Sequence, residues 1–390
     1  MEYILIIIIL SIGVFKYDTG RNKFSNYYYN FTLLVFVLIA GLSYRLGVDV
    51  VRYELMFENN YSSLLQFGSL FSTYGMESSE PLWVILNWFI YHTTGEFWVL
   101  KLIIAFWVNA VVFWFFKRNT SAPYFALMVY FLLQFFEINF QVLREALAIS
   151  FFLIALDQFI RHGLMRYFIW IVPAWFFHRF AVVTILFPLF FNIKFDKRIV
   201  YVLLICLIIA PFTRTIFSLI ASMSFLNIII GERITNLMDS ETYGIHTRNI
   251  FGILEVLVLF LVPVLLLLKN QKNSILLSLS ITYVLTILLK MSAFTILYRL
   301  NNYLVFPFAI SLSIALQNSL FKCDFSKQTV YFMRKKSMVL LCILLFFVNS
   351  INKIISSEDF VMYYPYSSII TKDIDRERER FYMDLIRNYY

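Results

Sequence analysis

Long apolar segments recur along the whole 390-residue chain and constrain its fold more than any other feature. Many approach the roughly 20 residues that a helix needs to cross a bilayer. Hydrophobic residues make up 61% of the sequence and charged residues only 15%, unlike a soluble globular domain. Because the bilayer cannot hydrogen-bond to the backbone, such segments must satisfy their own polar groups as helices. We therefore expect an all-α, polytopic membrane helical bundle.

The positive-inside rule predicts the orientation of this bundle from its basic connections. These connections, expected on the cytoplasmic side, are residues 16–23, 117–121, 161–166, 192–198, 269–273 and 318–336. Placing them all inside requires about twelve transmembrane helices. Their expected positions are 3–15, 28–44, 97–116, 122–138, 141–160, 167–177, 180–191, 199–212, 249–268, 274–290, 300–317 and 337–352.

Residues 1–352 then form one transmembrane domain with outer loops at 45–96 and 213–248, followed by an outer C-terminal tail, 353–390. The apolar stretch 81–95 is expected to be re-entrant or interfacial, since a full crossing would invert every later loop. The short pair at 167–177 and 180–191 is expected to be broken at Pro173 and Pro188. The mixed charges at the end of the tail are typical of a solvated helix end.

The predicted outer face carries its positive charge mainly on arginine, whereas the inner loops are richer in lysine. The outer arginines outside the tail are Arg45, Arg52, Arg144, Arg179, Arg214, Arg233, Arg248 and Arg299. A guanidinium offers a planar fork of donors that matches phosphate or carboxylate oxygens. Any single arginine here is equally explained by a nearby acid or a lipid phosphate. Together they predict an anionic headgroup bound at the outer surface.

Four short stretches hold the candidate site residues. If the chain is helical past Gly47, then Asp49, Arg52 and Tyr53 share one face, with Arg45 one turn earlier. Asp49 either merely neutralises the two arginines or orients one that grips the headgroup. The other stretches contain Arg144 and Glu145 one turn into a span, His178 and Arg179 between two apolar half-helices, and Tyr298 and Arg299 at a span entrance. Ionisable residues at such depth usually face a bundle interior or a wet cavity. For His178, a hydrogen-bonded structural role is the alternative.

Metal and disulfide chemistry have little support in the sequence. The four histidines are scattered and lack carboxylates at ligand spacing, so no metal and no cofactor are expected. The three cysteines lie in predicted spans or an inner loop, so no structural disulfide is expected. No nucleic-acid partner is expected either.

The order of several weak motifs resembles one known family. The motifs are Gly47-x-Asp49 with Tyr53, Glu80-Pro81, Arg144, Phe177-His178, Tyr298-Arg299 and Tyr363-Tyr364-Pro365-Tyr366. Their order and spacing are similar to the EpsG family of exopolysaccharide polymerases, relatives of the Wzy O-antigen polymerases. The chain departs from that pattern at Glu145, where the family often has Gln, and at Arg179-Phe180, where it often has a small or hydroxyl residue.

The resemblance implies a metal-independent, inverting glycosyl transfer at the outer face of the bacterial inner (cytoplasmic) membrane. The implied fold resembles the multi-spanning, GT-C-like glycosyltransferases. A glycan on undecaprenyl pyrophosphate would pass to a sugar hydroxyl of an incoming lipid-linked oligosaccharide. Donor, acceptor and membrane lipids are thus the implied partners, with a chain-length regulator and a flippase as further ones.

This chemistry assigns expected roles to the candidate residues. Arg144 and Arg299 would bind the departing pyrophosphate, with Arg45, Arg52 and Arg179 as second candidates. His178 is the candidate base for the acceptor hydroxyl, and Asp49 and Glu145 are alternatives. Tyr53 and Tyr298 complete the expected substrate-binding set. Two other functions remain open: a ligase that uses the same donor, and a transporter or flippase of lipid-linked sugar.

Overall fold

The computed structural model describes residues 2–19, 22–60, 80–191, 205, 275–290, 296–320, 361–372 and 375–388. Within these residues the chain is helical, and its only β-type pairing is an isolated antiparallel bridge between Ser43 and Ser368. The chain divides into two compact units, residues 1–186 with 348–390 and residues 187–347. The all-helical architecture agrees with the expected helical bundle.

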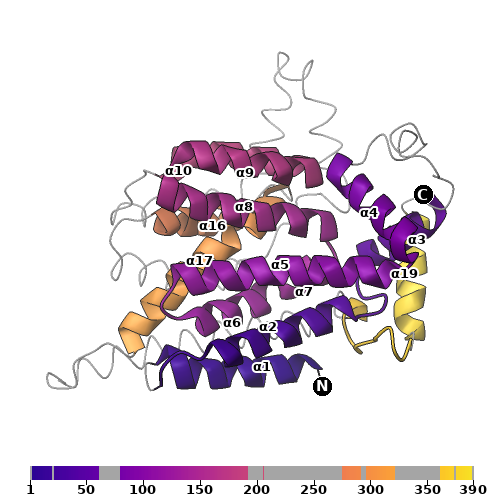
Figure 1. Cartoon of the computed structure of the whole chain (residues 1–390), viewed down its shortest axis with the longest axis horizontal. Coiled ribbons are helices and arrows are strands. Elements are labelled where there is room, and N and C mark those ends of the chain that lie inside the picture. The colour runs from indigo at the N-terminus through magenta and orange to yellow at the C-terminus, as the bar shows by residue number, and fades with distance from the viewer. Residues whose placement is uncertain are drawn as a thin grey trace, which may run out of the picture. The chain divides into compact units, whose positions relative to one another are not determined.

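The first unit is a bundle of helices of unequal length. Its elements are α1 (Glu2–Gly13), η1 (Val14–Asp18), α2 (Asn26–Gly41), α3 (Val48–Asn60), α4 (Pro81–Thr94), α5 (Phe97–Asn119), α6 (Pro123–Leu133), α7 (Phe135–Phe140), α8 (Leu143–His162), α9 (Leu164–Phe177), η3 (Arg179–Leu186) and α19 (Arg376–Asn388). Helices α1, α2, α5, α8 and α9 run side by side, and α3, α4 and α19 gather at one end of them (Figure 1). That end is where α8 begins and α9 finishes.

Aromatic side chains fill the centre of this unit. Phe36, Phe113, Tyr130 and Phe135 are all fully or almost fully buried. The Phe36 ring lies 5.1 Å from that of Phe135 and 5.2 Å from that of Phe113, both edge-on. Edge-to-face pairs at such distances stabilise a core beyond simple burial. They join α2, α5 and α7.

Both ends of α4 lie at the same end of the bundle. Pro81 starts the helix with the fixed φ that suits a first helical position. Gly95 ends it in the left-handed region, with φ of 70°. The residue before the helix, Glu80, contacts the start of α8, and α5 begins two residues after Gly95. The helix therefore leaves and re-joins the bundle on one side.

The second unit is described by its α-helices, α10 (Pro188–Phe191), α16 (Ile275–Lys290) and α17 (Ile296–Leu320). The long pair α16 and α17 packs closely, with the Ser280 and Ser311 hydroxyls hydrogen-bonded at 2.8 Å. Across the described part of the chain, residues 97–119 and 299–317 form helices of at least 18 residues that are apolar enough to cross a bilayer.

Most of the expected spans that fall on described residues correspond to helices. Those at 3–15, 28–44, 97–116, 141–160, 167–177, 274–290 and 300–317 match α1, α2, α5, α8, α9, α16 and α17. Apart from residue 205, the spans at 199–212, 249–268 and 337–352, like the outer loop at 213–248, lie outside the described residues. The number of transmembrane helices therefore stays a prediction.

Two local expectations are wrong, and a third is confirmed in part. Residues 122–138 form two helices, α6 and α7, because Gln134 leaves the helical conformation with φ of −141°. Residues 180–191 are divided at Pro188 as expected, but the part before Pro188 is the 3-10 helix η3 and the part that begins with it is the short α10. Pro173 lies inside α9 and does not end it. The missing Pro173 hydrogen bond is tolerated within a helix of 14 residues.

The described part of the C-terminal tail belongs to the first unit and is hydrogen-bonded close to the end of α2. The Tyr44 N–H donates to the Ser367 carbonyl at 2.8 Å, and the Ile369 N–H donates to the Leu42 carbonyl at 2.9 Å. These two bonds attach the segment 361–372 to the connection between α2 and α3.

Helix α19 buries one face against this connection. Its Arg378 is only 2% exposed and donates to the carbonyls of Val361 and Pro365. Its Tyr382 hydroxyl accepts the Gly47 N–H at 2.7 Å. The expectation of a solvated helix end holds for the exposed charged face of α19 and is wrong for the face that carries Arg378 and Tyr382.

Gly47 allows the close approach of this connection to the end of α7. Its φ is 89°, and a Cβ atom there would lie 1.8 Å from the Phe140 carbonyl oxygen. We expect Gly47→Ala to lower the thermal unfolding midpoint of the detergent-solubilised protein, because backbone strain costs about 1–2 kcal/mol and the clash adds to it. Gly95→Ala is the matched control, since φ is also positive there but the nearest atom is 3.9 Å away. Equal losses in the two variants would contradict this account.

Candidate functional site

Side chains from four segments meet where α8 begins and α9 ends. Arg144 comes from the first turn of α8, and Tyr53 from the middle of α3. Glu80 directly precedes α4, and His178 directly follows α9. Tyr53 and His178, the two members farthest apart in the sequence, are separated by 125 positions. The fold of the bundle therefore brings the cluster together.

Arg144 is held by two of its nitrogens. Its Nη1 lies 2.8 Å from Glu80 Oε2, and its Nε donates to the Tyr53 hydroxyl at 3.3 Å. The guanidinium carbon also lies 5.4 Å from the centre of the Tyr53 ring, within cation–π range. The Arg144 side chain remains 30% exposed. Its Nη2 has no hydrogen-bond partner among the described residues, so a fixed guanidinium still offers a donor to a ligand.

Glu80 is the centre of the cluster. Its side chain is 7% exposed, and its second oxygen, Oε1, lies 3.3 Å from His178 Nδ1 and 3.4 Å from the Arg179 backbone nitrogen. Burial by itself raises the pKa of Glu80, but the contact with His178 and the charge of Arg144 outweigh burial and bring the pKa to about 2. Glu80 is therefore a carboxylate at neutral pH and fixes Arg144 and His178 together.

His178 lies between two carboxylates. Nδ1 faces Glu80, and Nε2 lies 3.9 Å from Glu145 Oε2. Both ring nitrogens are buried, and neither makes an aligned hydrogen bond within the described part of the chain. In this arrangement a sugar hydroxyl cannot reach either nitrogen of the imidazole ring. It can instead position Glu80 and Glu145.

The start of α3 presents a second, more open group of charges. Asp49 is half-buried and lies one helical turn before Tyr53, and its backbone N–H donates to Gln141 Oε1 at 3.2 Å. Arg52 is exposed on the same helix. Arg45 pairs with Glu54, Nε to Oε2 at 2.7 Å, a partner that the sequence interpretation did not name. The expected helix past Gly47 is confirmed.

The remaining candidates are distributed between the two units. Arg179 is exposed and adjoins His178, in the first unit. Tyr298 and Arg299 lie in α17 of the second unit. The Tyr298 side chain lies outside the described residues, whereas Arg299 is exposed.

Glu80 is the site residue that the sequence interpretation missed. In the sequence it stands out only as part of a Glu-Pro motif, although a carboxylate directly before an apolar helix is a signal for a buried acid that needs a cation. Among the described residues, no three His, Cys, Asp or Glu side chains form a group suited to a metal ion. The charge available to a ligand in this cluster is that of arginine.

The family comparison covers nearly the whole chain. The model of the EpsG family matches residues 26–368. The chain belongs to the EpsG family. No curated protein and no solved structure matches it. The matched range of this EpsG-family protein includes Tyr53, Glu80, Arg144 and His178, and it ends before α19. Membership, together with the apolar helices, identifies a membrane protein of polysaccharide biosynthesis with a polymerase-type function.

Proposed function

We propose that this protein is a glycosyltransferase-type polymerase that joins undecaprenyl-pyrophosphate-linked oligosaccharide repeat units. The reaction takes place at the outer face of the bacterial cytoplasmic membrane. The acceptor hydroxyl attacks the anomeric carbon of the donor sugar, and the bond from that carbon to the pyrophosphate oxygen breaks. The hydroxyl proton passes to a base, and the product remains on the acceptor lipid. The observation that carries this proposal is the fixed but partly exposed guanidinium of Arg144 in a chain of the EpsG family.

The leaving pyrophosphate is already stable, so the protein contributes mainly positive charge and position. Glu80 and Tyr53 hold Arg144 through Nη1 and Nε before substrate arrives. Its remaining nitrogen, Nη2, then meets a phosphate oxygen without reorganisation of the side chain. Arg52 and Arg179 are exposed at the same end of the unit and supply further charge. Arg45, which pairs with Glu54, and Arg299, in the second unit, are further candidates for this charge.

The burial of His178 changes the preferred base. A base must come within hydrogen-bond reach of the acceptor hydroxyl. The His178 nitrogens are buried and Glu145 is 3% exposed, whereas Asp49 is half-buried and lies one turn from the tyrosine that contacts Arg144. We therefore assign the base role to Asp49, and positioning roles to His178 and Glu145.

Deletion of the gene tests this function in the cell. We expect the surface glycan to lose its long chains and keep single repeats, because export and ligation continue without polymerisation. Re-expression of the unchanged protein should restore the long chains. Complete loss of the glycan, single repeats included, would favour a flippase, and retention of free lipid-linked long chains would favour a ligase.

The orientation of the site is tested separately by cysteine labelling. In a background without the native cysteines, Glu58→Cys reports on the end of the bundle that carries the Arg144 cluster, and Lys117→Cys on the other end; both positions are exposed. A membrane-impermeant maleimide should label position 58 in intact spheroplasts and position 117 only after permeabilisation. The reverse pattern would place the cluster inside the cell and exclude the proposed reaction.

A further inference from the structure

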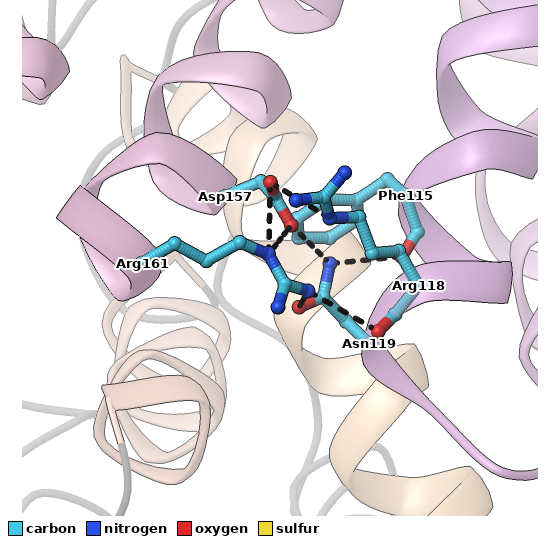
Figure 2. A network of polar contacts seen from close by, with 5 residues as sticks. All are labelled: Phe115, Arg118, Asn119, Asp157 and Arg161. Carbon is cyan, nitrogen blue, oxygen red and sulfur yellow. Dashed lines mark hydrogen bonds and ion pairs between the residues drawn. The ribbon is translucent and has the colours of Figure 1, made fainter.

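A second charged cluster lies at the opposite end of the first unit, where α5 and α8 end. Asp157 is fully buried, forms an ion pair with Arg118 Nε at 3.2 Å, and accepts hydrogen bonds from Arg161 Nε at 3.1 Å and Asn119 Nδ2 at 3.1 Å. Figure 2 shows both guanidiniums against this one carboxylate. Two positive charges therefore share one negative charge, and the cluster keeps a net positive charge.

The two guanidiniums have unused donors. Arg161 Nη2 reaches the Arg118 carbonyl at 3.4 Å and Asn119 Oδ1 at 3.5 Å. Within the described residues, Arg161 Nη1 and both terminal nitrogens of Arg118 make no hydrogen bond. The side chains are 41% exposed for Arg118 and 33% exposed for Arg161. Asp157 thus holds the Nε atoms and leaves terminal nitrogens free for an anion.

Apolar and aromatic side chains border this cluster. The Arg118 guanidinium lies 5.4 Å from the centre of the Trp114 ring. Only Gly163 separates α8 from α9, whose Leu164, Met165 and Ile169 are 46%, 76% and 60% exposed. Tryptophan beside a cation at the end of an apolar helix is typical of a membrane interface. The ligand that fits combines a phosphate with hydrocarbon chains.

We propose that Arg118 and Arg161 bind the headgroup phosphate of an anionic phospholipid. The Arg118 fork supplies paired donors to phosphate oxygens, and Asp157 fixes the two guanidiniums in place. The acyl chains lie along the exposed apolar side chains at the start of α9. Basic pockets between transmembrane helices commonly bind such headgroups. This site is separate from the Arg144 cluster, and its proposal does not rest on the glycosyl-transfer reaction.

The test compares lipid-dependent stability of the full-length protein in nanodiscs. One set contains phosphatidylcholine alone, and the other contains added phosphatidylglycerol. Unchanged protein should unfold at a higher temperature with phosphatidylglycerol, and Arg118→Gln should lose more than half of that gain. Lys117→Gln is the matched control, because it removes the same charge from the neighbouring exposed residue, whose amine bonds only to Asn26 Oδ1 among described residues. Lys117→Gln should keep the gain.

Binding is measured independently by native mass spectrometry. Unchanged protein should retain phosphatidylglycerol in preference to phosphatidylcholine, and Arg118→Gln should bind it roughly 10-fold more weakly, the loss expected for a charged hydrogen-bond pair. If Arg118→Gln does not fold, this preference of the unchanged protein decides the matter. The proposal is overturned by equal retention of the two lipids, by an undiminished gain in Arg118→Gln, or by an equal gain from inorganic phosphate alone. Those results would leave Asp157 as a structural link between α5 and α8.

Discussion

Asp49→Asn should slow chain extension by roughly 10²–10⁴-fold, the range expected when a general base is lost. Asparagine keeps the size of the side chain but cannot accept the proton of the acceptor hydroxyl. The Asp49 backbone N–H bond to Gln141 does not depend on the side chain, so α3 should still begin in the same place. The measurement is the initial rate of glycan lengthening by purified protein, followed over a range of pH.

His178→Gln provides the comparison for this prediction. A reaction that needs an unprotonated base becomes faster as the pH rises and the base loses its proton. Because both His178 nitrogens are buried against Glu80 and Glu145, the loss of His178 should lower the rate while preserving this increase of rate with pH. Asp49→Asn should abolish that increase. If the increase disappears in His178→Gln and persists in Asp49→Asn, the base is His178 and the assignment made here is wrong.

Arg144→Lys should reduce the extension rate by roughly 10-fold or more without reducing the amount of protein in the membrane. Arginine contacts Glu80 through Nη1 and Tyr53 through Nε, and it keeps Nη2 for the substrate. The single ammonium of lysine cannot occupy all of these positions. The loss should appear in the rate at saturating substrate, since the contact strengthens as charge develops on the pyrophosphate.

Arg380→Lys is the control for Arg144→Lys, because it makes the same exchange at an exposed position of α19. It should extend glycan at the parent rate. A parent rate in Arg144→Lys would remove Arg144 from the proposed mechanism. If Arg144→Ala loses activity only in proportion to its lower abundance in the membrane, the Glu80–Arg144 pair is structural.

The sequence predicts the helical segments of the first unit because its apolar runs are long and interrupted by charge. The run at 97–116 is one such case, and it matches α5 closely. The break at Gln134 has no glycine or proline to signal it. The 3-10 conformation of η3 has no distinct hydrophobic period, so an apolar segment of that length resembles an α-helix.

The site was predictable as a set of residues and not as a set of contacts. Tyr53, Arg144 and His178 were all identified because polar groups next to apolar runs need partners. Their actual common partner, Glu80, lies 64 positions from Arg144, a pairing that only the bundle establishes. The ion pair of Arg45 with Glu54 was equally hidden, since Arg45 precedes α3 with a positive φ of 45° and nine positions separate the two.

The most direct test of the central proposal is a reaction with purified components. The protein is placed in liposomes with one lipid-linked repeat unit as the only sugar source, and the products are sized with and without EDTA. The proposed polymerase should produce a ladder of lipid-linked products that grows by one repeat at a time, equally in both conditions. Unchanged single repeats, or movement of the lipid-linked repeat across the bilayer without lengthening, would contradict the proposal.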